Sequence, residues 1–201
     1  VYKRQYPSNI ADYTATYLAS EEQKNTPNQY SYLWPYSGTF SAVNALFAIT
    51  QDTLYQALLD NRFLIGLEKY FDNRRSPEGY ASYINTAPPS DRFYDDNIWL
   101  GIDFTDTYLI TQKDKYLQKA QFIWNFIESG IDDKLGGGIY WCEQRKRSKN
   151  TCSNAPGSVF ALKLFQATKD SIYLSKGEQL YNWTKEQLQD STDYLYFDHI
   201  T

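Results

Sequence analysis

Apolar residues recur at intervals of three and four positions along most of the chain, and they do so in three pairs of runs. The first pair consists of Phe40, Val43, Leu46 and Phe47 and then Leu59, Phe63, Leu67 and Tyr70. Two further pairs, over residues 99–127 and 159–188, show the same spacing. Such spacing gathers the apolar side chains on one face of an α-helix. The pattern therefore predicts three helical hairpins, preceded by one more helix at residues 9–18.

A short motif separates the two runs of each pair. It consists of a Thr and, five residues later, a Tyr, with an acidic residue between them, at residues 50–55, 111–116 and 168–173. We expect it to form a tight turn in which the acid caps the returning helix. A helical repeat of about 60 residues is typical of an array or a closed helical barrel. We therefore predict a single all-α domain over residues 1–201.

The most informative polar residues are the adjacent acids Asp95 and Asp96, which stand within the aromatic segment 93–100. We expect bulky neighbours such as Tyr94 and Trp99 to place the carboxylates in a partly dry, aromatic-walled cleft. Two carboxylates held close cannot both ionise freely, so one keeps its proton while the other remains a base or nucleophile. A glycosidase needs that combination at the bond it cleaves. The alternative is a pair of first-turn acids that match the dipole of a helix.

The register of the repeat places other candidates beside this acid pair. Counting back about 15 residues from each Thr of the motif reaches the start of the first helix of each hairpin. In a ring of hairpins these starts lie at one end, so we expect Trp34, Tyr36 and Ser153–Asn154 to share one cleft with the acids. Helix N-termini add free N–H groups there. Taken singly, Asp96 and Ser153 also fit helix N-caps.

Three consecutive glycines, residues 136–138, precede the third hairpin and are followed by Ile139, Tyr140 and Trp141. This pattern predicts a turn and a short extended segment. Glycine lets a backbone approach a ligand closely, so we expect Tyr140 or Trp141 to face one here. A phosphate loop is excluded, because no Lys-Ser/Thr follows at the required spacing.

Composition narrows the classes of partner. Aromatic residues make up 17% of the chain, with 19 Tyr and 5 Trp, which indicates either heavy core packing or a surface that stacks on sugars. The net charge of −4 argues against nucleic acid. The basic run at residues 145–149 is expected to be a solvated loop rather than a phosphate-binding patch. No segment has the apolar length of a membrane span.

Cys142 and Cys152 flank the basic run, and two alternatives stay open for them: a disulfide that closes the loop, or two free thiols. A metal site is not expected, because the only histidine, His199, is far away in sequence. The chain starts at Val1 without Met and ends on an aromatic segment. We expect a signal segment and further C-terminal residues to be absent from it.

Four motifs resemble glycoside hydrolase family 76, the endo-α-1,6-mannanases, over residues 29–201. They are the segments at residues 32–38, 94–99, 136–141 and 149–156. The resemblance implies an (α/α)6 barrel of six hairpins, of which this chain covers about the first half and is incomplete at its C-terminus. It implies retaining hydrolysis of α-1,6-linked mannan, with Asp95 as the nucleophile and Asp96 as the general acid/base.

The same resemblance implies a cleft lined by further motif residues, namely Asn97, Trp141, Lys149, Asn150, Ser153 and Asn154. A neutral sugar polymer requires no cofactor, so none is expected. The resemblance fits an exported, monomeric enzyme whose partner is an oligosaccharide or polysaccharide.

Two other readings of the chain stay open. One is a non-catalytic glycan-binding fragment that keeps the aromatic cleft. The other is a different carbohydrate enzyme on the same fold. An uronyl hydrolase needs a basic clamp for a carboxylate, and only Lys149 is available near the cleft. A sugar epimerase is expected to use a histidine, for which His199 is poorly placed in the sequence.

Overall fold

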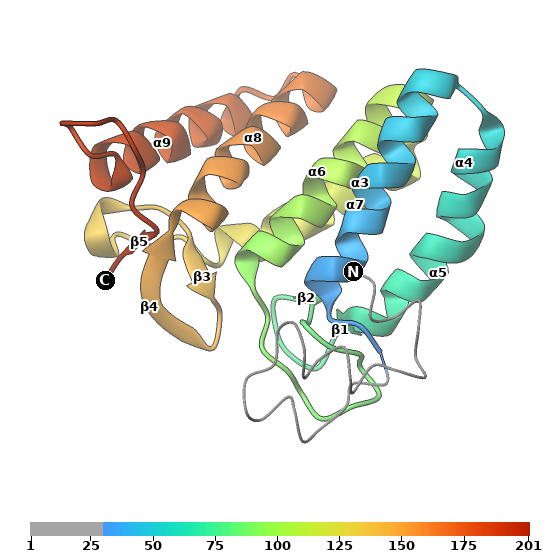
Figure 1. The fold of residues 1–201 in the computed structure, drawn as a ribbon, viewed down its shortest axis with the longest axis horizontal. Coiled ribbons are helices and arrows are strands. Elements are labelled where there is room, and N and C mark those ends of the chain that lie inside the picture. The colour runs from blue at the N-terminus through green and yellow to red at the C-terminus, as the bar shows by residue number, and fades with distance from the viewer. Residues whose placement is uncertain (1–29) are drawn as a thin grey trace.

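The computed structural model in Figure 1 describes residues 30–201 and consists of three helical hairpins in chain order. The first joins α3 (Leu33–Thr50) to a continuous helical segment made of α4 (Thr53–Leu58), the π-helix η3 (Leu59–Phe63), α5 (Leu64–Leu67) and the 3₁₀-helix η4 (Glu68–Tyr70). The second joins α6 (Tyr94–Thr111) to α7 (Asp114–Glu128), and the third joins α8 (Thr151–Thr168) to α9 (Ser171–Leu188). The predicted hairpins are thus confirmed, while the helix predicted at residues 9–18 lies outside the described residues.

The first helices of the hairpins form a row. The middle helix of that row, α6, packs against both α3 and α8, and the returning helices α7 and α9 each pack against the first helix of their own hairpin. Figure 1 shows α3, α6 and α8 side by side, with the strands gathered near the ends where these helices begin. None of the helices within residues 30–201 is both long and apolar enough to cross a lipid bilayer.

One turn geometry is used three times between the paired helices. The hydroxyls of Thr50, Thr111 and Thr168 donate to the carbonyl four residues earlier at 2.7, 2.7 and 2.8 Å. The next residue in each turn adopts a left-handed conformation, with φ of 54°, 56° and 62°. The N–H after it then bonds back to the same Thr hydroxyl. The Thr of the sequence motif therefore ends one helix and orders the turn that follows.

Capping by the acid of this motif is confirmed in two of the three turns. Asp52 and Asp170 are the N-caps of α4 and α9, and each accepts the backbone N–H two residues on at 2.9 Å. The prediction is wrong for the second turn, where Lys113 is the N-cap and Asp114 is the first residue of α7. The acid stands one position later there, so its carboxylate is already inside the helix.

Short strands precede the second and third hairpins. β1 (Phe71–Asp72) pairs with β2 (Gly79–Tyr80), while β4 (Arg145–Asn150) lies between β3 (Tyr140–Cys142) and β5 (His199–Ile200), all antiparallel. The basic run is therefore a strand, and the expectation of a solvated loop is wrong. Only its first residues are exposed: Arg145 forms an ion pair with Asp91, whereas Lys149 is completely buried.

The core lies between the helices of the row and their returning partners, and most of the aromatic excess packs there. The ring of Phe40 contacts those of Phe63 and Phe104, with centroids 4.8 and 4.9 Å apart. A side chain at Gly101 would meet the ring of Phe160 at 2.2 Å. Glycine at this position therefore allows α6 and α8 to pack closely through that ring.

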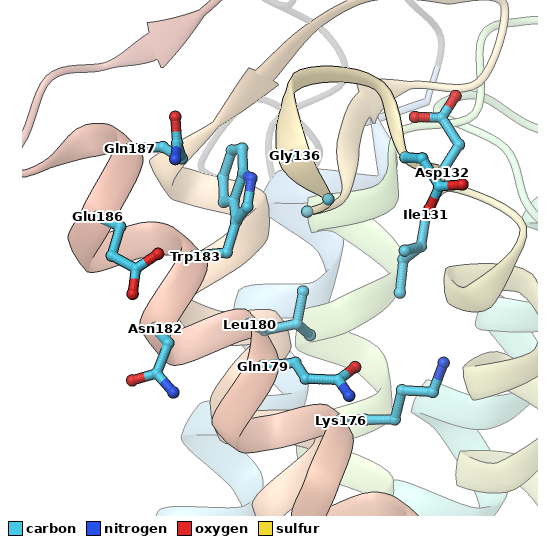
Figure 2. Close-up of a pocket in the computed structure, with 13 residues that line it drawn as sticks. Ile131, Asp132, Gly136, Lys176, Gln179, Leu180, Asn182, Trp183, Glu186 and Gln187 are labelled. Atoms are coloured by element: carbon cyan, nitrogen blue, oxygen red, sulfur yellow. The ribbon is translucent and has the colours of Figure 1, made fainter.

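The glycine run forms a tight turn against α9. All three glycines have positive φ, and a Cβ at Gly138 would lie 2.7 Å from the ring of Trp183, whose Nε1 donates to the Leu135 carbonyl at 2.9 Å. Figure 2 shows Trp183 beside Gly136, at one end of a groove of about 510 Å³ between this turn and α9. The backbone at the glycines is thus closely approached, as expected, but the group that approaches it is the indole of Trp183.

Candidate active site

The second residues of the three row helices line one cleft. These residues are Trp34 in α3, Asp95 in α6 and Cys152 in α8, and the cleft has a volume of about 510 Å³. The starts of helices far apart in the sequence thus meet at one place, as the register of the repeat predicts. The remaining lining residues are Trp99, Trp141, Ser148, Asn150, Asp198 and His199.

Three tryptophans give the cleft exposed aromatic faces. Trp34, Trp99 and Trp141 are 58%, 39% and 37% exposed, whereas most aromatic rings of the core are covered. Sugars present apolar C–H faces that pack against such rings while their hydroxyls bind polar groups at the edge. Asn150 and Ser148, which are hydrogen-bonded to each other at 2.8 Å, supply polar groups on the β4 side.

Asp95 lies on the wall of this cleft with one oxygen held and the other unpaired. Its Oδ2 accepts the indole N–H of Trp141 at 3.2 Å, and its Oδ1 is buried without a hydrogen-bond partner among the described residues. Burial raises the pKa of Asp95. Hydrogen bonds from the Cys152 thiol, the Trp141 indole and the backbone N–H groups at the start of α6 lower this pKa, but they do not cancel the effect of burial. An unpaired, partly desolvated carboxylate oxygen is suited to attack carbon.

Asp96 occupies a drier position than its neighbour. The residue is 8% exposed, and burial together with the negative charge of Asp95 raises its pKa to about 8. It therefore carries a proton at neutral pH, which a general acid requires. Capping does not explain either acid, because the N-cap of α6 is Phe93, and Asp95 and Asp96 stand inside the helix.

The raised pKa of Asp96 predicts a pH-dependent stability. The folded state binds this proton more tightly than the unfolded state, whose carboxyl has a pKa near 3.8. The contribution of Asp96 protonation to the free energy of unfolding is therefore fully present below that pKa and is lost as the pH rises through about 8. Urea unfolding between about pH 4 and pH 8 should show falling stability, with a smaller fall in Asp96→Asn. Part of the fall should persist, because burial also raises the pKa of Asp103 to about 7. An unchanged slope in Asp96→Asn would contradict the raised pKa.

Two asparagines predicted to line the cleft instead organise the backbone behind it. Asn97 and Asn154 are the fourth residues of α6 and α8, and both are completely buried. Each bonds the N–H and the carbonyl of one extended residue, Tyr80 or Ile139, and also the carbonyl of its helix N-cap. The repeat therefore uses one amide clamp twice, and neither amide is left to bind a sugar.

Four more predicted lining residues also lie away from the cleft. Tyr94 is buried against Phe126, and the hydroxyl of Tyr36 donates to the carbonyl of Phe63 at 2.7 Å. Tyr140 is buried with its hydroxyl on Asp132, and Lys149 is completely buried beside it. None of these four side chains lines the cleft, and the polar group of each is hydrogen-bonded within the protein.

Lys149 holds the turn that contains the glycines. Its ammonium donates to the Asp132 carboxylate at 2.8 Å and to the carbonyls of Asp132, Lys134 and Gly137 at 3.0, 2.7 and 2.6 Å. Four acceptors around one buried ammonium leave no donor for a substrate carboxylate. Lys149 is therefore a structural residue, and the basic clamp of an uronyl hydrolase is not found at this position.

Cys152 and Ser153 stand in the first turn of α8, which follows β4 directly, and Cys142 is the last residue of β3. Ser153 is completely buried, and its hydroxyl has no hydrogen-bond partner among the described residues. Cys142 is buried and Cys152 is exposed at the cleft, and both are free thiols, so the disulfide alternative is not adopted. Although the residue is exposed as a whole, its thiol is partly buried, and this desolvation together with the charge of Asp95 raises the pKa of Cys152 to about 12.

Ser148, Cys152, Asp198 and His199 line the cleft although sequence reasoning does not select them. For Cys152 a signal is present, since it occupies the same helix position as Asp95 and Trp34. For Asp198 and His199 none is available, because the pairing of β5 with β4 brings them to the cleft from the end of the third hairpin. Within residues 30–201 no group of three or more His, Cys, Asp or Glu side chains is arranged to hold a metal ion.

Several solved structures that are similar to this chain are proteins of glycoside hydrolase family 76. A family 76 mannosidase from Bacteroides thetaiotaomicron is 26% identical, with a TM-score of 0.80 over 100% of this chain and 58% of its own. An α-mannanase of the family from the same organism is 27% identical, with a TM-score of 0.77 over 98% of this chain and 56% of its own. The GH76A α-1,6-mannanase from Salegentibacter sp. is 27% identical, with a TM-score of 0.69 over 98% of this chain and 55% of its own.

The chain spans about half the length of these solved structures. Its three hairpins correspond to about the first half of an (α/α)6 barrel, as predicted. No curated protein sequence matches the chain. The model of Glycosyl hydrolase family 76 matches residues 3–201, and the chain therefore belongs to that family.

Proposed function

We propose that this protein is a retaining glycosidase that hydrolyses α-1,6-mannosidic bonds in mannan. The observation that carries the proposal is the acid pair at the start of α6, with Asp95 exposed to a tryptophan-lined cleft and Asp96 buried with a raised pKa. A Salegentibacter α-1,6-mannanase with two consecutive aspartates replaced by asparagine is described as inactive and is seen in complex with α-1,6-mannotriose. That relative supports a part in catalysis for the adjacent acids of this chain.

The first step forms a bond between Asp95 and the sugar. The carboxylate of Asp95 attacks the anomeric carbon of a mannose unit as the bond from that carbon to O6 of the next unit breaks. Asp96 gives its proton to the departing O6. Asp96 is then ionised, and its charge no longer faces a free Asp95 carboxylate, because Asp95 has become a neutral ester.

The second step releases the sugar. Asp96, now a carboxylate, takes a proton from water, and the oxygen of that water attacks the anomeric carbon as the bond to Asp95 breaks. Both acids return to their starting states, and two inversions at the carbon leave its configuration unchanged. The three tryptophans would hold the sugar rings, with Asn150 and Ser148 on their hydroxyls. A polymeric substrate of this kind is consistent with an exported enzyme.

The test is hydrolysis of α-1,6-mannotetraose followed by proton NMR, with α-1,2- and α-1,3-linked mannobiose as linkage controls. The proposal expects cleavage of the α-1,6-linked substrate, with the α-anomer released first and mutarotation later. Release of the β-anomer would overturn retention, and preferential cleavage of another linkage would overturn the specificity. Binding of the tetraose without cleavage would favour the glycan-binding alternative.

A further inference from the structure

The end of the described chain returns to the start of α8 and is fixed there by backbone bonds. The N–H of Thr151 donates to the Asp198 carbonyl at 2.9 Å, and the hydroxyl of Thr151 donates to the Phe197 carbonyl at 2.7 Å. β5 then pairs with β4, with His199 opposite Asn150. In Figure 1, β5 lies beside β4 where α8 begins. The position of His199 on the wall of the cleft that Asp95 also lines is thus held by backbone hydrogen bonds of the fold.

The His199 ring is oriented by its neighbour and has one nitrogen left. Its Nδ1 lies 2.8 Å from Asp198 Oδ2, an oxygen that also lies 3.5 Å from the Asn150 amide nitrogen. The other ring nitrogen, Nε2, has no hydrogen-bond partner within residues 30–201. The side chain is 45% exposed and lines the same cleft as Asp95 and the tryptophans.

A hydroxyl group is a suitable ligand for Nε2 of His199. In the neutral ring Nδ1–H donates to the Asp198 carboxylate, so Nε2 accepts a hydrogen bond, and in the protonated ring Nε2 donates one. A sugar hydroxyl both accepts and donates, so it satisfies Nε2 in either state. The neighbouring aromatic faces suit the C–H face of the same sugar ring.

We propose that His199 is a substrate-binding residue of the cleft, whose Nε2 contacts a hydroxyl of the bound glycan and whose ring is held by Asp198. The inference rests on the proposed function, since it takes a mannan chain as the ligand. His199 is the only histidine of the chain. It does not serve as the acid or base, because Asp96 holds the proton at the reacting bond.

Three substitutions in the intact protein separate binding from structural support. Glutamine can place a nitrogen near the position of Nε2, and asparagine near that of Nδ1. His199→Ala should raise KM for α-1,6-mannotetraose about tenfold, the effect of one lost hydrogen bond, and lower kcat by a smaller factor. His199→Gln should recover most of the affinity, whereas His199→Asn should resemble alanine. Lys185→Ala, an exposed position on α9, is the control expected to behave as wild type.

The outcomes separate this inference from the proposed function. Binding of α-1,6-mannotriose is measured by calorimetry in the Asp95→Asn background, with and without His199→Ala. An affinity lower by about tenfold supports the inference even if the wild-type protein cleaves nothing, which would sink only the proposed function. Equal affinities, an asparagine variant that works better than glutamine, or a loss confined to kcat would each overturn the role given to His199.

Discussion

Asp95→Asn and Asp96→Asn should each lower the turnover of α-1,6-mannan by several orders of magnitude in the intact protein while the fold survives. A positioned general acid contributes on the order of 10²–10⁴-fold, and without the nucleophile the covalent route is lost altogether. Asparagine keeps the shape of the side chain. At Asp95 it removes a charge that burial disfavours, and at Asp96 it removes the need to take up a proton on folding. We therefore expect the melting temperature to stay the same or to rise at neutral pH.

The control for this prediction is another acid at a helix start. Asp52 caps α4 at the far end of the first hairpin, and its side chain accepts the N–H of Leu54. Asp52→Ala should cost about 1 kcal/mol of stability and leave turnover unchanged. If Asp95 and Asp96 were only first-turn acids that match the helix dipole, their variants would show that same pattern. Turnover and melting temperature measured on all three variants distinguish the two accounts.

Lys149→Met should lower the free energy of unfolding by about 1–3 kcal/mol, the cost of leaving acceptors without the donor they share, while the half-exposed Asp132 carboxylate stays hydrated. Methionine fills the space of the lysine stem, but it leaves the Asp132 carboxylate and three carbonyls without their shared donor. The turn at residues 132–138 then loses its main tie to β4. Urea denaturation at neutral pH measures the loss.

Lys146→Met is the matched control, because Lys146 lies on the same strand with an exposed side chain. Its ammonium donates only to the carbonyl of Ser129 at 2.8 Å, in contact with water. The substitution should change stability by about 0.5 kcal/mol or less. Similar losses in the two variants would mean that burial of Lys149 does not matter, and would contradict the structural role given to it.

The repeat made most of the fold predictable from the sequence. Periodicity identifies a helix and the face it buries, and the recurring Thr identifies the turn, because its hydroxyl makes the same two bonds at residues 50, 111 and 168. A constant distance from that turn then gives the start of each row helix. This distance is sufficient to predict that Trp34 and Asp95 line one cleft, as the structure shows.

The sequence did not allow us to predict which polar side chains at the starts of the row helices face the cleft. Asn97 stands two residues after Asp95 on the same helix, yet its amide turns to the backbone of Tyr80, a residue placed there by the β1–β2 pair. Lys149 and Asn150 are adjacent on β4, and strand alternation buries the first and brings the second to the cleft. Both outcomes depend on neighbours distant in sequence, for which local spacing carries no signal.

Covalent trapping distinguishes the nucleophile from the general acid. The intact protein is incubated with an activated fluoromannoside, digested, and the peptide containing residues 93–100 is fragmented to distinguish the two adjacent aspartates. We expect one sugar per protein, attached to Asp95, and no attachment in Asp95→Asn. A sugar found on Asp96, or turnover without any covalent intermediate, would contradict the assignment of Asp95 as the nucleophile and Asp96 as the acid.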